Sequence, residues 1–181
     1  DVIIAIKLLI NDGFDDIHLN LCGGFYDAKT EENNEIKSEK DLIAYLKKLG
    51  LENCITYHGE VLGDYKKEQL ETAHLFILPT YYPWEGQPLS IIEAMAFATP
   101  IISTYHKGIP ELIENAKTGY FVEARSPEQI ASSIIKIFSD LDDYENMSHQ
   151  SRVMYEKKFK QDVHLKKLIN IIYENQLLDI D

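Results

Sequence analysis

The chain has 181 residues, of which 30 are acidic and 18 are basic, so its formal net charge is −12. Hydrophobic residues make up 45% and charged residues 27% of the chain, a composition that excludes a disordered protein and suits one globular domain. The acidic balance also argues against a nucleic-acid partner, because phosphate contacts need clustered lysine and arginine.

Hydrophobic periodicity predicts alternating helices and strands in the first half of the chain. The pattern favours a helix at 1–10, a strand at 17–22, a helix at 40–49, a strand at 54–58 and a helix at 65–73. Gly50 is suited to end the second helix. Polar, turn-forming residues over 27–38 predict a surface loop or the start of a helix.

The alternation continues in the second half. It predicts a buried strand at 75–79, a helix at 88–98, a strand at 100–105, a short helix at 109–115 and a strand at 120–122. Ser126, Pro127 and Gln129 have the pattern of a capping box, which predicts the start of a helix that runs to about Phe138. Helical stretches at 140–159 and 162–178 form a tail without strands.

This order predicts an α/β fold with a Rossmann-like, doubly wound parallel sheet and a helical C-terminal tail. Because a doubly wound domain begins with a strand, we expect the first strand to lie before Asp1. We assign residues 1–139 to the domain and 140–181 to helices packed on it. By analogy with the 3-2-1-4-5-6 order, the strands should run 54–58, 17–22, a gap, 75–79, 100–105 and 120–122.

Cysteine and histidine usage predicts neither disulfides nor a metal site. Cys22 and Cys54 lie in apolar, β-prone stretches, so we expect buried, reduced thiols, which fit the cytosol. None of the six histidines lies near another at metal-ligand spacing. His58 ends a strand, where a structural role is favoured over contact with a ligand.

The segment after the strand at 75–79 is the strongest candidate for a ligand site, because ligands of open α/β sheets bind beyond the carboxyl ends of the strands. Pro88 suits the first position of the following helix. The free backbone amides at such a helix start bind anions, most often phosphate, and Gly86 lets a ligand approach the backbone closely. The candidate amides belong to Gln87, Leu89 and Ser90.

Glu93 lies in an otherwise apolar helix, where a carboxylate is costly unless it is paired or hydrogen-bonded. Its side chain leans toward the start of the helix, and an ionised carboxylate can accept hydrogen bonds from the vicinal hydroxyls of a ribose. Glu85 could accept one from a sugar hydroxyl in the same way. The alternative is a surface charge at Glu85 and a lysine pair for Glu93.

The spacing of these two glutamates, together with the helix and strand that follow, resembles a known family. Residues 78–134 (LPTYYPWEGQPLSIIEAMAFATP and onward) resemble the C-terminal, donor-binding domain of retaining GT-B glycosyltransferases of family 4, also called glycosyl transferases group 1. Weaker similarity extends back to Asp1. The resemblance implies a nucleotide-sugar donor, a UDP-, GDP- or ADP-sugar, whose sugar is transferred with retention and without a required metal.

The resemblance also implies a role for each motif residue. Glu85 would be the catalytic residue that contacts the donor sugar, and Glu93 would bind the ribose hydroxyls. Val61 would contact the base. The sugar and phosphates would be held by the backbone of Gly86, Gln87, Leu89 and Ser90.

For the full-length protein, the resemblance implies a hexosyl-type transferase of bacterial polysaccharide or glycolipid synthesis. A glycan or lipid-linked acceptor would bind a separate N-terminal domain, and the protein would be cytoplasmic, with peripheral association at the inner face of the membrane. In the family, an arginine and a lysine that neutralise the diphosphate follow the first strand. We therefore expect the 181-residue chain to bind donor weakly and to transfer nothing.

Several residues depart from the family or leave alternatives open. The loop usually reads Glu-Gly-aromatic-Gly but here reads EGQP, and Gly-Gly-Ile-Pro-Glu becomes KGIPE at 107–111. Lys107 approaches the phosphates or, as we favour, is solvated. The aromatic residues at 81, 82 and 84 form an acceptor or lid surface, or cover the sheet edge. Asp140 and Asp142 spell a D-x-D metal motif, but N-capping explains them better.

Two further functions fit the same architecture. One is a non-catalytic nucleotide-binding or assembly module that kept the fold. The other is a GT-B-type nucleotide-sugar epimerase, which would not be expected to carry this pair of glutamates.

Overall fold

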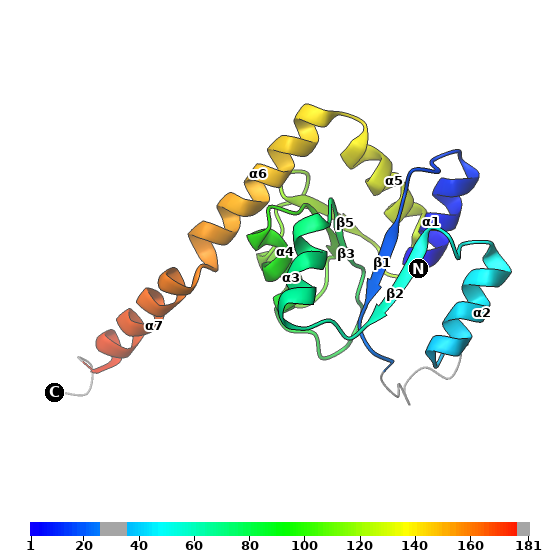
Figure 1. Ribbon diagram of the computed structural model, residues 1–181. Coiled ribbons are helices and arrows are strands. Elements are labelled where there is room, and N and C mark those ends of the chain that lie inside the picture. Colours follow the sequence, from blue (N-terminus) through cyan, green and yellow to red (C-terminus); the bar gives the residue numbers. More distant parts are fainter. Residues whose placement is uncertain (26–35, 177–181) are drawn as a thin grey trace. The chain divides into compact units, whose positions relative to one another are not determined.

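The computed structural model describes residues 1–25 and 36–176, so most of the loop predicted at 27–38 lies outside the described residues. The chain divides into two compact units, residues 1–72 and 73–181 (Figure 1). The boundary expected after residue 139 is a different one, because it separates the domain from its C-terminal helices. That boundary stays a prediction.

The described residues of unit 1, 1–25 and 36–72, form two parallel strands and three helices. In chain order these are α1 (Val2–Asn11), β1 (Leu19–Cys22), α2 (Glu39–Leu49), β2 (Ile55–Gly59) and α3 (Gly63–Thr72). Strand β1 pairs with β2 in parallel, with Leu19 opposite Ile55. Helix α2 begins at Ser38, whose side chain accepts a hydrogen bond from the Asp41 N–H, and it ends at Gly50 in the left-handed conformation, as predicted.

Unit 2 contains a three-stranded parallel sheet in the order β3-β4-β5. Its elements are β3 (Phe76–Leu78), α4 (Leu89–Ala96), β4 (Ile101–Thr104), the 3₁₀ turn η1 (Ile109–Glu111), β5 (Gly119–Val122), α5 (Pro127–Phe138), α6 (Leu141–Lys158) and α7 (Gln161–Gln176). Within each unit the neighbouring strands are those that the sequence predicts. The α/β class and the parallel pairing are therefore confirmed.

The central strand β4 is the most deeply buried strand of unit 2, because strands pair with it on both sides. The run at 75–79 predicts a fully buried strand, but Phe76–Leu78 are only half-buried. Strand β3 lies at the edge of the unit 2 sheet, so no strand among the described residues of the unit, 73–176, pairs with it on one side.

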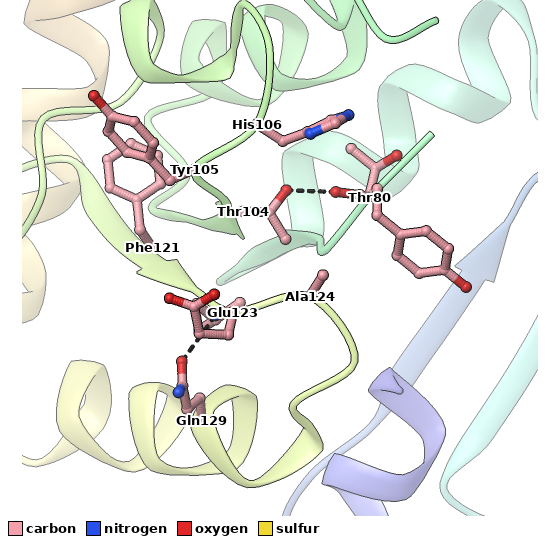
Figure 2. Close-up of a pocket in the computed structure, with 10 residues that line it drawn as sticks. Thr80, Thr104, Tyr105, His106, Phe121, Glu123, Ala124 and Gln129 are labelled. Atoms are coloured by element: carbon pink, nitrogen blue, oxygen red, sulfur yellow. Dashed lines mark hydrogen bonds between the residues drawn. The ribbon is translucent and has the colours of Figure 1, made fainter. Parts of the chain in front are cut away.

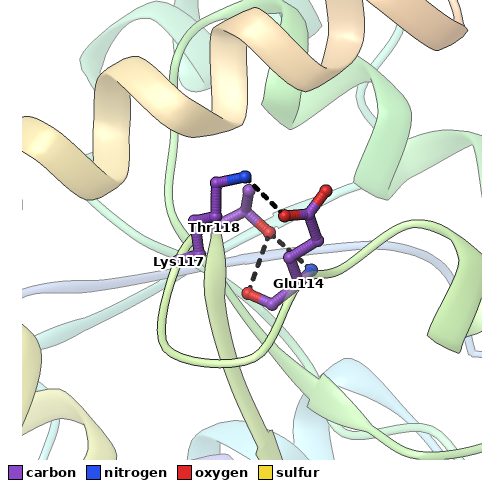
Figure 3. Close-up of polar contacts among 3 residues, drawn as sticks. All are labelled: Glu114, Lys117 and Thr118. Atoms are coloured by element: carbon purple, nitrogen blue, oxygen red, sulfur yellow. Dashed lines mark hydrogen bonds and ion pairs between the residues drawn. The ribbon is translucent and has the colours of Figure 1, made fainter.

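The last strand needs a glycine at its start. Gly119 lies opposite Ile101 and has φ +158°, and a Cβ at this position would lie 1.8 Å from the Ile101 carbonyl oxygen. The preceding turn is closed by the Glu114 N–H, which donates to Thr118 Oγ1 at 2.9 Å, and by Lys117 Nζ, which lies 2.6 Å from Glu114 Oε2 (Figure 3). This turn ends the predicted helix at 109–115 early, so that only η1 is helical.

Helix α5 begins at Pro127, as predicted, but without a capping box. The Ser126 side chain makes no capping hydrogen bond. The Gln129 Oε1 atom instead accepts from the Glu123 N–H at 2.8 Å. The expected reciprocal pair is absent because the Gln129 side chain turns back toward the end of β5.

Helix α6 packs on α4. Side chains of α6 donate hydrogen bonds to carbonyls at and just beyond the C-terminal end of α4. Ser148 Oγ donates to the Ala98 carbonyl at 2.6 Å, and Ser151 Oγ donates to the Thr99 carbonyl at 2.8 Å. Arg152 donates to the Ala96 carbonyl. The end of α4 is thereby satisfied by side chains far away in the sequence.

Cys22 is exposed and Cys54 is half-buried, so the expectation of two buried thiols is wrong for Cys22, which ends β1. Within residues 1–25 and 36–176, no helix is both long enough and apolar enough to cross a bilayer.

Candidate functional site

The loop between β3 and α4 holds most of the predicted site residues. Glu85 is half-buried in this loop, and its N–H donates to the Tyr82 carbonyl at 3.1 Å. Gly86 and Gln87 follow in exposed positions. Since the strands of unit 2 are parallel, this loop lies at the same edge of the sheet as the segments that follow β4 and β5.

Helix α4 starts one residue later than predicted. Pro88 is buried and takes the N-cap position with φ −64°, and the Ile91 N–H donates to its carbonyl at 3.1 Å. Leu89 and Ser90 are therefore the first helical residues. Their amides belong to the first turn, which has no acceptors within the helix and carries the positive end of the helix dipole.

Glu93 lies little more than one turn into α4. The face that α4 buries is formed by Ile91, Ala94 and Met95. Glu93 is half-buried beside that face, and its Oε2 atom is fully buried. Together, Glu85 and Glu93 place one carboxylate before and one after the amides of the first turn.

The loop that follows β4 packs against the loop between β3 and α4. A Cβ at Gly108 would lie 2.7 Å from the Gly86 carbonyl oxygen and 2.9 Å from Gln87 Cγ, so the two backbones are in close contact. The Gln87 side-chain amide donates to the Glu111 carboxylate. The segment around η1 therefore holds the loop that contains Glu85. The KGIPE motif at 107–111 is visible in the sequence, but its pattern does not predict this contact.

The three aromatic residues of the loop differ in their exposure and surroundings. Trp84 is 83% exposed and Tyr82 is 57% exposed, so neither covers the sheet edge. Tyr81 is 36% exposed and lines a pocket of about 170 Å³ at the carboxyl ends of β3, β4 and β5. This pocket contains none of the predicted donor-site residues.

The remaining candidates have local roles or lie elsewhere. Val61 follows β2 in unit 1, and its contact with a base stays a prediction. His58 uses both ring nitrogens within unit 1: Nδ1 accepts from the Tyr65 hydroxyl at 2.5 Å, and Nε2 donates to Asn20 Oδ1 at 2.8 Å. These bonds favour the structural interpretation of His58.

Two more of the alternatives left open by the sequence concern Lys107 and the D-x-D motif at 140–142. Lys107 is exposed, which agrees with a solvated lysine. Asp140 caps α6 by accepting from the Asp143 N–H at 3.0 Å, which confirms the N-cap interpretation. The part of the chain that the structure describes contains no cluster of three or more histidine, cysteine or acidic side chains placed to hold a metal ion.

Comparison with known proteins connects this geometry to a family. Residues 1–154 match the family model described as glycosyl transferases group 1. The chain is 30% identical over 139 residues to WcaL of Salmonella typhimurium, a glycosyltransferase assigned to colanic acid biosynthesis, and the match covers 74% of this chain and 34% of WcaL. It is 29% identical over 126 residues to the amylovoran biosynthesis glycosyltransferase AmsK of Erwinia amylovora, covering 67% of this chain and 31% of AmsK. The chain spans about a third of the length of these relatives.

Solved structures share the fold. HepE of Anabaena, solved in complex with UDP-glucose, is 17% identical with a TM-score of 0.79, and the match covers 96% of this chain and 44% of HepE. A glycosyltransferase of Rickettsia africae is 20% identical with a TM-score of 0.77, covering 99% of this chain and 44% of that one. The fold is thus the Rossmann-like one of GT-B glycosyltransferases. With residues 1–154 matched by its model, the chain belongs to the glycosyl transferases group 1 family.

Proposed function

We propose that this chain is the donor-binding domain of a retaining glycosyltransferase. One observation carries the proposal: Glu85 and Glu93 flank the amides of the first turn of α4, at the edge where the strands of unit 2 end. Amides at a helix start suit phosphates, whereas carboxylates suit hydroxyl groups. A nucleotide-sugar contains both kinds of group.

Each residue of the site has a distinct role in this proposal. Glu93, whose carboxylate is partly buried, accepts hydrogen bonds from the ribose hydroxyls. Glu85 is the catalytic residue and contacts the transferred sugar. The sugar and the diphosphate lie against the backbone of Gly86, Gln87, Leu89 and Ser90, and the base lies near Val61.

The proposed reaction forms a bond between an acceptor hydroxyl oxygen and the anomeric carbon of the donor sugar. The bond between that carbon and the diphosphate oxygen breaks. The nucleoside diphosphate leaves with the electron pair of that bond, and the proton of the acceptor hydroxyl passes to the departing diphosphate. The new bond keeps the anomeric configuration of the donor. The proposed reaction includes no metal cofactor. Chelation of metal ions with EDTA should therefore leave donor binding unchanged.

The relatives support a narrower substrate class. WcaL and AmsK are named for the synthesis of colanic acid and amylovoran. HepE was solved with UDP-glucose. We therefore propose UDP-hexose as the first donor to test and an acceptor that belongs to bacterial polysaccharide or glycolipid synthesis. We also propose that the full-length protein is cytoplasmic and lies at the inner face of the membrane.

The test is a calorimetric titration of the chain with UDP and UDP-glucose, with GDP and ADP as comparisons. Glu93→Ala should weaken binding of the preferred nucleotide about 10- to 100-fold, because hydrogen bonds to a charged group contribute about 1.5–3 kcal/mol. Glu145→Ala, which removes an exposed carboxylate from α6, is the matched control. Equal affinity of Glu93→Ala and the unmodified chain would refute the ribose role. No binding of any nucleotide would refute the proposed function.

A further inference from the structure

The Tyr82 carbonyl oxygen accepts two hydrogen bonds from different segments of unit 2. The Glu85 N–H donates to it at 3.1 Å and closes a turn that has Pro83 and Trp84 at its centre. Proline is favoured at the second position of such a turn, because its φ is already fixed there. The second donor is Nε2 of the His106 ring, at 2.8 Å, from the segment that follows β4. One carbonyl group therefore joins His106 to the turn that ends at Glu85.

This bond is the last of three between side chains of the β4 segment and the chain at the end of β3. Leu78 lies opposite Ser103 where the paired register of β3 and β4 ends, and Ser103 Oγ donates to the Leu78 carbonyl at 2.6 Å. Two residues further along, the Thr80 carbonyl accepts from Thr104 Oγ1, as Figure 2 shows. The Tyr82 carbonyl follows after two more residues. Side chains of one segment thus hold three alternate carbonyls, and the last of these belongs to the turn.

The histidine itself is held by its backbone. The His106 N–H donates to the Thr104 carbonyl at 2.9 Å, its carbonyl accepts from the Ile109 N–H at 3.1 Å, and its side chain is half-buried. A carbonyl oxygen only accepts hydrogen bonds, so Nε2 of His106 carries the hydrogen of the bond to Tyr82. The neutral ring protonated at Nε2 and the charged ring both meet this requirement. His106 therefore holds the turn in either protonation state.

We infer that His106 is a positioning residue for the reaction, and that it acts through the Tyr82 carbonyl on the placement of the Glu85 carboxylate. This inference rests on the proposed function, in which Glu85 contacts the transferred sugar. A reacting group that is misplaced by a fraction of a bond length loses much of its effect, so a residue that fixes the turn contributes to the reaction without touching the substrate.

A different contact supports the part of the loop that follows Glu85. A Cβ at Gly108 would lie 2.7 Å from the Gly86 carbonyl oxygen, so the two backbones are in close contact there. The backbone beyond this contact is the part proposed to hold the diphosphate. Loss of the His106 bond should therefore weaken recognition of the sugar and leave recognition of the diphosphate nearly unchanged.

The test is a calorimetric titration of the 181-residue chain with UDP and UDP-glucose, because the ratio of the two dissociation constants isolates the contribution of the glucose. His106→Phe keeps a ring but removes the donor. It should weaken UDP-glucose about threefold or more relative to UDP, and change UDP itself less than about twofold. His106→Gln, whose amide nitrogen can replace Nε2 as donor, should keep the ratio within about twofold of the unmodified chain.

The matched control is His18→Phe. It removes another histidine whose Nε2 bonds a neighbour at 2.8 Å, the Thr56 hydroxyl, just before the start of β1. Ligands of open α/β sheets bind at the opposite, carboxyl ends of the strands. His18→Phe should therefore bind both UDP and UDP-glucose like the unmodified chain.

A double variant tests whether His106 acts through Glu85. Glu85→Ala should also weaken UDP-glucose about threefold or more relative to UDP, because it removes the proposed sugar contact. Adding His106→Phe to Glu85→Ala should change the ratio less than about twofold, since residues that act as a unit have non-additive effects. A purely structural role of His106 would instead weaken UDP and UDP-glucose equally, or lower the ratio further in the double variant.

The outcomes separate this inference from the proposed function. If Glu85→Ala changes the ratio and His106→Phe does not, this inference is overturned and the proposed function stands. Equal losses for UDP and UDP-glucose in His106→Phe, or a loss in His106→Gln as large as in His106→Phe, would overturn it as well. If Glu85→Ala leaves the ratio unchanged, or if no nucleotide binds, the proposed function fails and this inference fails with it.

Discussion

Gly108 is a residue whose importance depends on one contact. Its φ of −82° suits any residue, so alanine is compatible with the backbone there. The obstacle is the Gly86 carbonyl oxygen, which would lie 2.7 Å from the new Cβ. Since Gly86 precedes the amides at the start of α4, a change at Gly108 acts directly on the loop proposed to hold the donor.

We therefore expect Gly108→Ala to displace the loop and weaken nucleotide binding about tenfold or more, because a small misplacement of binding groups is costly. Glu111→Ala, which frees Gln87 at an exposed hydrogen bond, should weaken it less, about fivefold or below. Glu111→Gln keeps an acceptor oxygen and should bind like the unmodified chain. Calorimetric titration measures all three, and unaltered binding by Gly108→Ala would contradict a support role for this loop.

Glu114 is the residue for which a dependence on pH can be derived. The hydrogen bond from Lys117, with its positive charge, lowers the pKa of the Glu114 carboxyl below its ordinary value. A lowered pKa in the folded state stabilises the protein at pH values above the ordinary glutamate pKa of about 4.3. This contribution is lost as the pH falls through the lowered pKa of the folded state.

Replacing Lys117 with methionine should therefore reduce the free energy of unfolding at pH 7 but not at pH 2. The difference should be below about 1 kcal/mol, because both side chains are largely exposed. Urea denaturation at a series of pH values measures it, with Lys117→Arg as the variant that keeps the charge. An equal loss at pH 2 and pH 7 would show that Lys117 acts by packing instead.

At the scale of elements, helix α4 is held at its two ends by different partners. Its start directly follows the loop that Gly108 supports, and carbonyls at and just beyond its end accept hydrogen bonds from Ser148, Ser151 and Arg152 of α6. The chain after Ala96 ends the helix with a residue in the left-handed conformation, Ala98, at φ +61°. Helix α6 therefore anchors the element whose first turn carries the proposed site.

Ser151 offers a test of this anchoring. Ser151 is fully buried, so Ser151→Ala leaves the Thr99 carbonyl without that donor and should lower the free energy of unfolding by about 1–3 kcal/mol. Ser132→Ala is the matched control, because Ser132 donates to the Gln129 carbonyl at an exposed position on α5. Thermal and urea denaturation measure both variants, and equal losses would argue against a special contribution of the α4–α6 contact.

At the scale of the whole molecule, the net charge of −12 bears on how an anionic donor binds. The proposed site uses backbone amides and the dipole of α4 for the phosphates, and its two side-chain charges are carboxylates. The negative net charge of the chain therefore repels an anionic nucleoside diphosphate at long range. Salt should screen this repulsion.

We expect the dissociation constant for UDP to stay within about threefold, or to fall, when NaCl is raised from about 10 mM to about 100 mM, because the Debye length decreases from about 30 Å to about 10 Å. A basic phosphate site would weaken over the same interval. Titrations at both salt concentrations measure the effect. Weakening by more than tenfold would indicate that lysine or arginine side chains bind the phosphates.

The sequence by itself determined the order and type of nearly all elements, because hydrophobic period, glycine positions and caps such as Ser38 and Asp140 act within a few residues. The spacing of Glu85 and Glu93 also identified the family. Only the tertiary structure decided the contacts between distant segments: Gly108 against Gly86, Gln87 with Glu111, and Ser151 with Thr99. Such contacts leave no periodic pattern, because they depend on which strands lie side by side and where their loops end. The pocket at the carboxyl ends of β3, β4 and β5 is of the same kind, since its lining comes from three loops that meet only at the edge of the sheet.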